Sequence, residues 1–212
     1  MNRIKIIESQ IPSCKVFADV GCDHGYVTEL MLKHQKCQVA YITDISKKCL
    51  EKAENLLKDQ IALNKCKSFV ADGFTGVPQP DTALIAGMGG EEIVKILKNS
   101  PYKIENLVLN PMKNFRLVRE YLVNNGYKIL TDFTFFSGKY YQLIRATLGS
   151  QSLTEEQLEL GLTNVENPSQ DFKNYAYTEI KKLNKLVEKQ EIKLADKEIF
   201  IQKINRLKKY VN

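Results

Sequence analysis

The chain has 212 residues, of which 43% are hydrophobic and 26% charged, and its formal net charge is +6. No apolar run approaches the roughly 20 residues that a helix needs to cross a bilayer. The N-terminal segment MNRIKIIESQIPSCK lacks the apolar core of a secretory signal. The five cysteines are scattered without a C-x-x-C pair, which argues against a zinc site. We therefore expect a cytoplasmic protein without a membrane segment or a bound metal, and the positive charge suits a phosphate-rich partner without identifying one.

Strand and helix patterns alternate through the first 148 residues, which is typical of repeated βαβ units and a largely parallel sheet. We expect strands at 15–20, 38–43, 67–70, 82–86 and 105–110. Amphipathic helices are expected between them, at 25–35, 46–62, 90–98 and 113–125. The segment YKILTDFTFFSGKYYQLIRATL then contains two β-rich runs joined by Ser137, Gly138 and Lys139. That pattern predicts an antiparallel hairpin at the end of the sheet.

The last quarter of the chain has a helical pattern. No proline or glycine occurs from Ser169 to Asn212. Apolar residues recur there at helical spacing, at Ile180, Leu183, Val187 and Leu194. This predicts a coiled-coil-like pair of helices that turns near 190–197, and hence an α/β domain at 1–150 followed by a helical domain at 151–212. The same apolar stripe could form a dimer seam, although we favour a monomer.

The segment VFADVGCDHGY resembles the glycine-rich turn of a nucleotide-binding fold, but Asp23 replaces the second glycine. A carboxylate within about 4 Å of a phosphate costs on the order of 1 to 4 kcal/mol. The turn therefore disfavours a dinucleotide and suits a cosubstrate with a positive centre, such as S-adenosylmethionine. With one substitution, Asp19-x-Gly21-x-Asp23-x-Gly25 matches the (D/E)-x-G-x-G-x-G motif of class I methyltransferases. Turns of this kind also occur without any ligand.

Two more acids follow the next two strands, at the edge where open α/β sheets bind ligands. Asp44 is placed to hydrogen-bond ribose hydroxyls, or else to cap the following helix. Asp72 is placed near an adenine amino group, or else belongs to a simple Asp-Gly turn. Gly87, Met88 and Gly89 follow the fourth strand, where glycine permits close backbone approach or merely a tight turn.

Asn110 and Pro111 end the fifth strand, where amino-methyltransferases carry an (N/D)-P-P-(Y/F) motif. The Asn110 amide could meet the edge of a base, because it has both a donor and an acceptor. The next two residues are Met112 and Lys113, so the motif's aromatic residue is missing. Asn-Pro is also a common turn opener.

The segments ADVGCDHGY, DGF, IAGMGG and GKYYQLIRA, with the Asn-Pro strand end and the helical tail, resemble the bacterial tRNA adenine-22 N1-methyltransferases. The resemblance implies a Rossmann-like class I methyltransferase that transfers the methyl group of S-adenosylmethionine to N1 of an adenine in the D-loop region of tRNA. The tail would help to hold the tRNA. Members often have Gln-Pro-Asn where this chain has Asn110, Pro111 and Met112, and alanine where it has Gly25.

The candidate site residues fall into three groups. Those expected to bind the cofactor are Asp19, Gly21, Cys22, Asp23, Asp44, Ile45, Asp72, Gly73, Gly87, Met88 and Gly89. Those expected to face the methyl group and the base are Asp23, His24, Tyr26, Asn110 and Pro111, although His24 could instead cap the loop and Tyr26 could pack at a helix start. Those expected to contact the RNA backbone are Lys113, Arg116, Arg119 and Lys139, each of which could also be an ordinary surface charge.

Other functions remain open at this stage. A methyltransferase acting on another RNA or on a small molecule would share the same cofactor residues. A non-catalytic RNA-binding protein could use the same fold. In the tail, Lys203, Arg206, Lys208 and Lys209 form a basic end that serves either tRNA contact or solubility.

Overall fold

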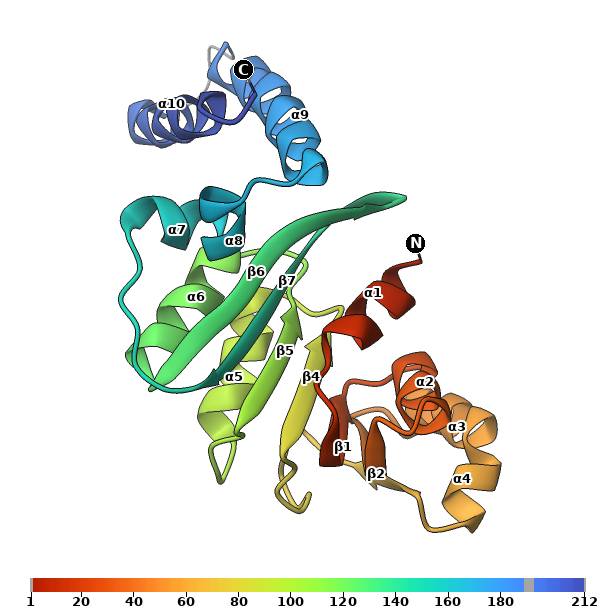
Figure 1. Ribbon diagram of the computed structural model, residues 1–212. Helices are drawn as coiled ribbons and strands as arrows, with labels where there is room; N and C mark the ends of the chain where they lie inside the picture. Colours follow the sequence, from red (N-terminus) through yellow and green to blue (C-terminus); the bar gives the residue numbers. More distant parts are fainter. Residues whose placement is uncertain (1, 189–192, 212) are drawn as a thin grey trace.

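A seven-stranded sheet runs through the centre of the molecule (Figure 1). The computed structural model describes residues 2–188 and 193–211. The strand order is β3-β2-β1-β4-β5-β7-β6, with β1 at Cys14–Val20, β2 at Cys37–Asp44, β3 at Cys66–Val70, β4 at Thr82–Ala86, β5 at Asn106–Asn110, β6 at Tyr127–Ser137 and β7 at Lys139–Leu148. The first five strands are parallel, and β7 is antiparallel to both β5 and β6. The predicted sheet with a terminal hairpin is confirmed.

Helices cover both faces of the sheet. One face packs against α5 (Gly90–Asn99) and α6 (Phe115–Asn124), and the other against α2 (Tyr26–Lys33) and α3 (Lys47–Leu56). The helix predicted at 46–62 is divided at the buried Leu57 into α3 and the short α4 (Lys58–Ala62). Because the helices begin where the parallel strands end, the loops that carry the candidate residues meet at one edge of the sheet.

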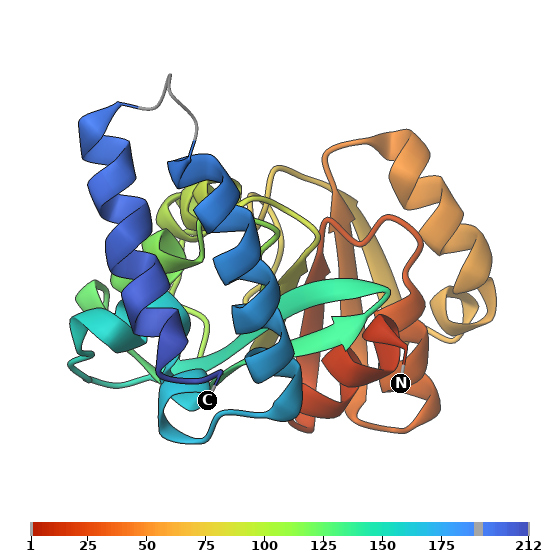
Figure 2. The same ribbon diagram turned by 90° about the horizontal axis from the view of Figure 1, so that it is seen from above.

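An N-terminal helix, α1 (Arg3–Gln10), was not among the expected elements. The Asn2 side chain caps it by accepting a hydrogen bond from the N–H of Ile4 at 3.0 Å. Ile7 and Ile11 are buried in the same core as α2 and α3. Figure 2 shows the tip of the β6–β7 hairpin beside α1. There the Ser137 hydroxyl accepts a hydrogen bond from the N–H of Arg3 at 3.0 Å.

The tail consists of α7 (Glu155–Leu160), α8 (Leu162–Glu166), α9 (Gln170–Val187) and α10 (Leu194–Lys208). The first two helices were not expected. Leu183 is buried in a separate core between α9 and α10, where Ile180 and Val187 are partly buried. Most of the apolar stripe is therefore used within the chain, whereas Leu194 is exposed. Residues 189–192 of the predicted turn lie outside the described residues, and α10 begins inside the predicted 190–197 segment.

The tail also covers the free edge of the sheet. Strand β6 has a strand neighbour on one side only, and several of its remaining N–H groups donate to side-chain oxygens of the chain that follows β7. The pairs are Ile129 with Gln151, Asp132 with Thr163, Thr134 with Asn164 and Phe136 with Asp171, at 2.7 to 2.9 Å. These contacts satisfy backbone donors that would otherwise be open to another strand.

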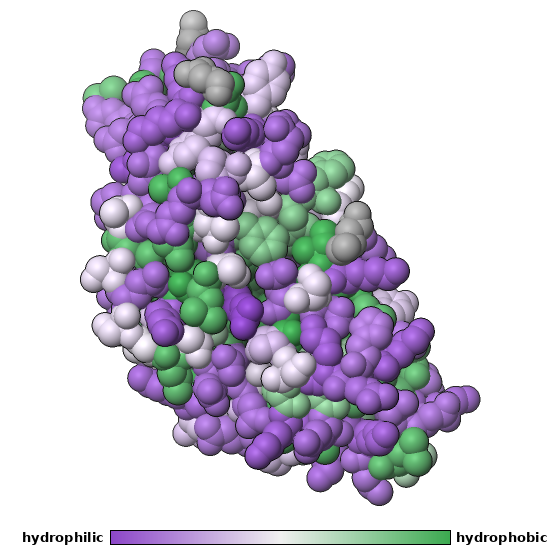
Figure 3. Space-filling view, viewed as in Figure 1, coloured by the Kyte–Doolittle hydropathy of each residue, from purple (hydrophilic) through white to green (hydrophobic). Residues whose placement is uncertain are grey.

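The surface seen in Figure 3 is mostly hydrophilic, with a more hydrophobic area over the β6–β7 hairpin. Phe136, at the end of β6, is half exposed in this region. Among the described residues, no helix combines the length and the apolar character required to cross a membrane.

Candidate cofactor and acceptor site

The loop after β1 adopts the left-handed backbone conformation at every second residue. The φ angles are 69° at Gly21, 46° at Asp23 and 71° at Gly25. Asp is among the few residues other than glycine that tolerate this region, which explains how Asp23 can occupy a glycine position. A Cβ atom at Gly21 would overlap the Cε atom of Met88. The loops after β1 and β4 therefore touch at Gly21 and Met88.

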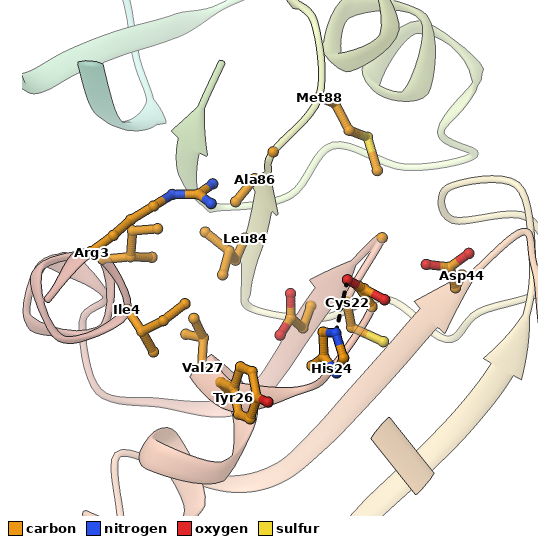
Figure 4. Close-up of a pocket in the computed structure, with 15 residues that line it drawn as sticks. Arg3, Ile4, Cys22, His24, Tyr26, Val27, Asp44, Leu84, Ala86 and Met88 are labelled. Atoms are coloured by element: carbon orange, nitrogen blue, oxygen red, sulfur yellow. Dashed lines mark ion pairs between the residues drawn. The ribbon is translucent and has the colours of Figure 1, made fainter. Parts of the chain in front are cut away.

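A cavity of about 470 Å³ opens between these two loops and α1 (Figure 4). Seven of the predicted cofactor residues line it: Asp19, Gly21, Cys22, Asp23, Asp44, Gly87 and Met88. His24 and Tyr26, which were predicted to face the base, also line it. The remaining wall is formed by α1, α2 and β4, through Arg3, Ile4, Ile7, Val27, Leu84 and Ala86. The cavity is thus acidic on the side of the β1 and β2 ends and largely apolar beneath α1.

Four predicted cofactor residues are not part of this lining. Ile45 and Asp72 are exposed beyond the ends of β2 and β3. Gly73 is buried, and its carbonyl accepts a hydrogen bond from the Thr43 hydroxyl at 3.3 Å. Gly89 caps α5. A role for these four in cofactor binding stays a prediction.

Asp19 is the buried acid of the cavity, 5% exposed. The Thr28 hydroxyl donates to its Oδ2 at 2.9 Å. Burial raises the pKa of Asp19 from 3.8 to about 6, and the bond from Thr28 opposes this rise only in part. Because the ionised carboxylate is poorly solvated here, a cationic ligand group beside it would be strongly favoured.

Asp44 and Asp23 are more accessible. Asp44 Oδ1 accepts a hydrogen bond from the N–H of Ser46 at 2.8 Å, while Ser46 itself caps α3. The other carboxylate oxygen of Asp44, Oδ2, has no hydrogen bond among the described residues. Asp23 forms an ion pair with Lys52, in which Nζ lies 2.9 Å from Oδ1. Lys52 does not line the cavity, but it neutralises the charge of Asp23, one of the three acids that do.

His24 and Tyr26 form a stacked pair at the mouth of the cavity. Their ring centroids are 5.3 Å apart and the rings are inclined by 10°. His24 Nε2 lies 3.5 Å from Asp23 Oδ2, and both rings are about half exposed (Figure 4). An exposed pair of aromatic faces next to a cofactor-sized cavity is suited to stacking against a base.

Asn110 differs from its predicted role, because its side chain is fully buried. Its Oδ1 accepts hydrogen bonds from Arg3 Nε at 2.9 Å and Arg3 Nη2 at 2.7 Å, and its Nδ2 donates to the Gln142 carbonyl at 2.6 Å. The prediction that this amide meets the edge of a base is therefore wrong for this conformation. Pro111 is also buried and outside the cavity lining.

The predicted RNA-contacting residues have different surroundings. Arg119 is fully buried, with Nε 2.6 Å from Asp132 Oδ2, so the prediction that it contacts RNA is wrong. Arg116 is paired with both Glu120 and Glu155, which limits its availability for phosphate.

Lys113 and Lys139 are exposed. Lys113 lies 3.4 Å from Glu91, and Lys139 lies over the ring of Tyr141. Their contact with RNA stays a prediction.

The sequence reading missed the contribution of α1 to the cavity. Arg3, Ile4 and Ile7 come from a segment to which no element was assigned. The capping residue Asn2 and the isoleucines at positions 4, 7 and 11 are a helix signal that could have identified it.

Comparison with known proteins places this geometry in a family. The model of the "Methyltransferase domain" family matches residues 1–144. The chain belongs to the methyltransferase-domain family. A Mycoplasma pneumoniae relative, named as a candidate tRNA methyltransferase, is 34% identical to this methyltransferase over 155 residues, which cover 69% of this chain and 71% of the relative. The tRNA (adenine(22)-N(1))-methyltransferase of Bacillus subtilis is 25% identical over 165 residues, which cover 75% of this chain and 69% of that enzyme.

Solved structures share the fold over nearly the whole length. The structure of M. capricolum TrmK in complex with S-adenosyl-homocysteine has a TM-score of 0.88 at 24% identity, covering 99% of this methyltransferase and 96% of that chain. The B. subtilis m1A22 tRNA methyltransferase TrmK has a TM-score of 0.85 at 20% identity, covering 99% and 97%. Sheet, hairpin and tail thus recur together in these chains.

Proposed function

We propose that this methyltransferase transfers the methyl group of S-adenosylmethionine to N1 of adenine 22 in bacterial tRNA. The observation that carries the proposal is its relationship to the B. subtilis enzyme of that name, over three quarters of this chain. Such an enzyme would act in the cytoplasm, where tRNA is found.

The residues of the cavity fit the cofactor. S-Adenosylmethionine carries a sulfonium and an amino group, and the cavity presents Asp19, Asp23 and Asp44. Asp44 Oδ2, which has no hydrogen bond within residues 2–188 and 193–211, is available for the ribose hydroxyls. The left-handed turn at Gly21 lets the backbone approach the ligand closely. The same three acids would repel the pyrophosphate of a dinucleotide.

When bound, S-adenosylmethionine supplies a methyl group on a positively charged sulfur. The N1 atom of adenine has an in-plane lone pair, so it forms the new N–C bond while the S–C bond breaks and its electron pair stays on sulfur. No proton has to be removed before transfer. The protein's task is therefore alignment, for which well-oriented systems gain roughly 7 to 11 kcal/mol.

The stacked pair of His24 and Tyr26 is placed to receive the extruded adenine at the mouth of the cavity. Stacking of a base on an aromatic ring contributes about 1 to 3 kcal/mol. Asp23 lies beside this pair and can accept a hydrogen bond from the adenine amino group.

The test is transfer of label from methyl-labelled S-adenosylmethionine to unmodified tRNA, followed by nucleoside analysis. We expect labelled N1-methyladenosine in the parent transcript and none in a transcript whose adenine 22 is changed to guanine. Equal labelling of both transcripts would assign another target position. Binding of S-adenosylhomocysteine without transfer to any tRNA would contradict the proposed substrate.

A further inference from the structure

The β6–β7 hairpin extends past its neighbour β5 at the edge of the sheet where the cofactor cavity lies. Strand β7 pairs with β5 only from Thr147 to Ile144, whereas its pairing with β6 continues to Lys139. The part of β6 from Phe133 to Ser137 therefore lies beyond the strand pairs of β5. Because the parallel strands end at this edge, the tip of the hairpin projects above it (Figure 1).

The tip is held in place from two sides. On the side of the tail, Asp171 Oδ2 accepts a hydrogen bond from the N–H of Phe136 at 2.9 Å. On the side of α1, the Ser137 hydroxyl accepts one from the N–H of Arg3, a residue that lines the cavity. The cavity wall thus touches the tip directly, and the side chains of the tip stand on a fixed support.

Three aromatic rings lie in a row from the tip to the tail. Phe136 and Tyr140 are opposite each other on the hairpin, with ring centroids 5.1 Å apart and planes inclined by 64°. Tyr140 in turn lies 5.7 Å from Tyr175 of α9. Tyr175 is partly buried in the core of the tail, whereas Phe136 is 49% exposed. The row therefore has a fixed inner end and an open outer face.

The surroundings of Phe136 favour a nucleic acid as its partner, although one exposed phenylalanine alone would indicate nothing. No aspartate or glutamate occurs at positions 133–154. Lys139 is exposed, with Nζ 5.2 Å from the centre of the Tyr141 ring, and it has no ion pair among the described residues. The carboxylate at the tip, Asp171, uses one oxygen on the backbone of Phe136. Exposed rings and cations together bind unpaired nucleotides, because the ring stacks on the base and the cation meets the phosphate.

Extrusion of the target adenine would expose a base face to such a ring. A base that leaves its stack uncovers the faces of the bases on either side of it. An aromatic side chain that stacks on one of these faces restores part of the lost stacking. His24 and Tyr26 are placed for the extruded base itself. Figure 1 shows α1 between α2, which begins at Tyr26, and the hairpin, so the tip stands on the other side of α1 from this pair.

We propose that Phe136, with Tyr140 behind it, stacks on an unpaired nucleotide next to the base that is methylated, and that Lys139 contacts the phosphate of this nucleotide. The inference rests on the proposed function, because it requires a tRNA substrate. It gives the hairpin a part in substrate recognition that is separate from cofactor binding. It also predicts that the aromatic face of Phe136 is required, and not its apolar volume alone.

The test measures tRNA binding by fluorescence anisotropy, with S-adenosylhomocysteine present, and methyl transfer in a single turnover. Phe136→Ala should weaken tRNA binding by roughly 5- to 150-fold, the range for loss of one stacked base, and should slow transfer at limiting tRNA by the same factor. Phe136→Leu keeps most of the apolar volume without an aromatic face, so it should bind tRNA nearly as weakly. Phe136→Trp should restore binding. The affinity for S-adenosylhomocysteine should stay unchanged in all three variants.

Leu148→Ala is the matched control. Leu148 is an apolar residue of similar exposure, 40%, at the opposite end of the same hairpin. This variant should bind tRNA as tightly as the unaltered protein does. Urea denaturation of every variant checks that the fold is retained.

The position of the contact is tested with 2-aminopurine, a fluorescent base that is quenched when it is stacked. It is placed before the methylated base in one transcript and after it in another. At one of these two positions, the complex with Phe136→Ala should fluoresce more strongly than the complex with the unaltered protein. Equal fluorescence of the two complexes at both positions would overturn the proposed contact.

Other results would also overturn the inference. One is tRNA binding by Phe136→Ala that is as tight as that of the unaltered protein, which would favour a protein partner for the tip. Full recovery in Phe136→Leu is another, because the residue would then only pack the hairpin against the tail. Methyl transfer to a nucleotide other than adenine 22, with tRNA binding that still requires the ring, would contradict the proposed function alone. Failure of the unaltered protein to bind tRNA would refute both.

Discussion

The cofactor edge and the junction between hairpin and tail are both rich in polar side chains, but they use them differently. At the cofactor edge, Asp19, Asp23 and Asp44 line a cavity, and Arg3 keeps donors without a partner among the described residues. At the junction, Arg119 and Asp132 are fully buried and paired with each other. Arg119 also donates to Gln142 and to the carbonyl groups of Leu158 and Glu159. Polar groups with unused capacity at an open edge indicate ligand binding, whereas saturated ones hold elements together.

The largest effect is expected at the junction. Arg119→Ala leaves Asp132 buried without its counter-charge, which should lower the free energy of unfolding by about 3 to 5 kcal/mol. Urea denaturation measures this, with Arg116→Ala as the matched control on the same helix, where a half-exposed ion pair should contribute at most about 1 kcal/mol. Similar stability of the two variants would contradict the distinction between junction and surface.

Replacement of both junction partners separates charge from packing. Arg119→Met with Asp132→Leu should recover much of the lost stability, because no buried charge is then unpaired.

At the cofactor edge, Asp19→Asn should raise the free energy of unfolding, whereas Arg119→Ala lowers it at the junction. The folded-state pKa of Asp19 is raised to about 6 from 3.8, so the folded protein binds this proton more tightly than the unfolded chain does. Ionised Asp19 therefore destabilises the fold at pH values above 6, by up to about 3 kcal/mol, and this cost disappears as the pH falls from 6 towards 3.8. The variant should be more stable than the parent at pH 7.5 in urea denaturation, and should bind S-adenosylhomocysteine more weakly.

The same residue predicts a pH dependence of binding. The affinity of the parent protein for S-adenosylhomocysteine should rise with pH through about 6, as Asp19 ionises and attracts the amino group. Calorimetry across this range should show a much flatter profile for Asp19→Asn. Parallel profiles would mean that Asp19 does not face the ligand's cation.

A smaller effect, confined to RNA, is expected for Tyr26→Ala. Loss of one stacking face should reduce methyl transfer to tRNA by roughly 5- to 150-fold, which corresponds to about 1 to 3 kcal/mol. Stability should change by less than about 1 kcal/mol because the ring is half exposed. Single-turnover transfer and S-adenosylhomocysteine binding, measured side by side, distinguish this from cofactor loss. An equal drop in methyl transfer and in S-adenosylhomocysteine affinity would place Tyr26 in the cofactor site.

The smallest effect on stability is expected for Lys52→Met. Its ion pair with Asp23 is exposed to solvent, so its loss should change stability very little. Its removal leaves Asp23 unneutralised, so binding should shift several-fold in favour of cationic S-adenosylmethionine over S-adenosylhomocysteine. An unchanged ratio of the two dissociation constants would show that Asp23 lies too far from the sulfur to influence it.

The sheet could be predicted because its signals are local. β-rich runs and helical spacing gave the parallel strands and the hairpin, and the acids at the strand ends followed from topology. The helices α1 and α7 also carry local signals, which are Asn2 before an apolar helical period and the Thr154–Gln157 capping box. Both helices could therefore be predicted from their sequence alone.

Other features of the site could not be predicted, because they depend on packing between distant segments. Arg116 and Arg119 lie three residues apart on one helix and look equivalent in sequence, but β6 and α7 bury only Arg119. The bond between Asn110 and Arg3 joins residues 107 positions apart. Spacing could identify Asn110 as a polar residue at a strand end, but not which partner would occupy its amide.

The side-chain caps on β6 have a consequence for synthesis of the chain. Asp171, which caps Phe136, is translated 35 residues after it, and Thr163 and Asn164 likewise follow their partners by about 30 residues. At roughly 5 to 20 residues per second, the edge of β6 lacks these caps for roughly 2 to 7 seconds on the ribosome. During that interval it can pair with another nascent strand. Folding of the tail onto β6 therefore ends this period of aggregation risk. In a chain truncated before Thr163, the caps from Thr163, Asn164 and Asp171 could not form, and the edge of β6 would stay open to pairing.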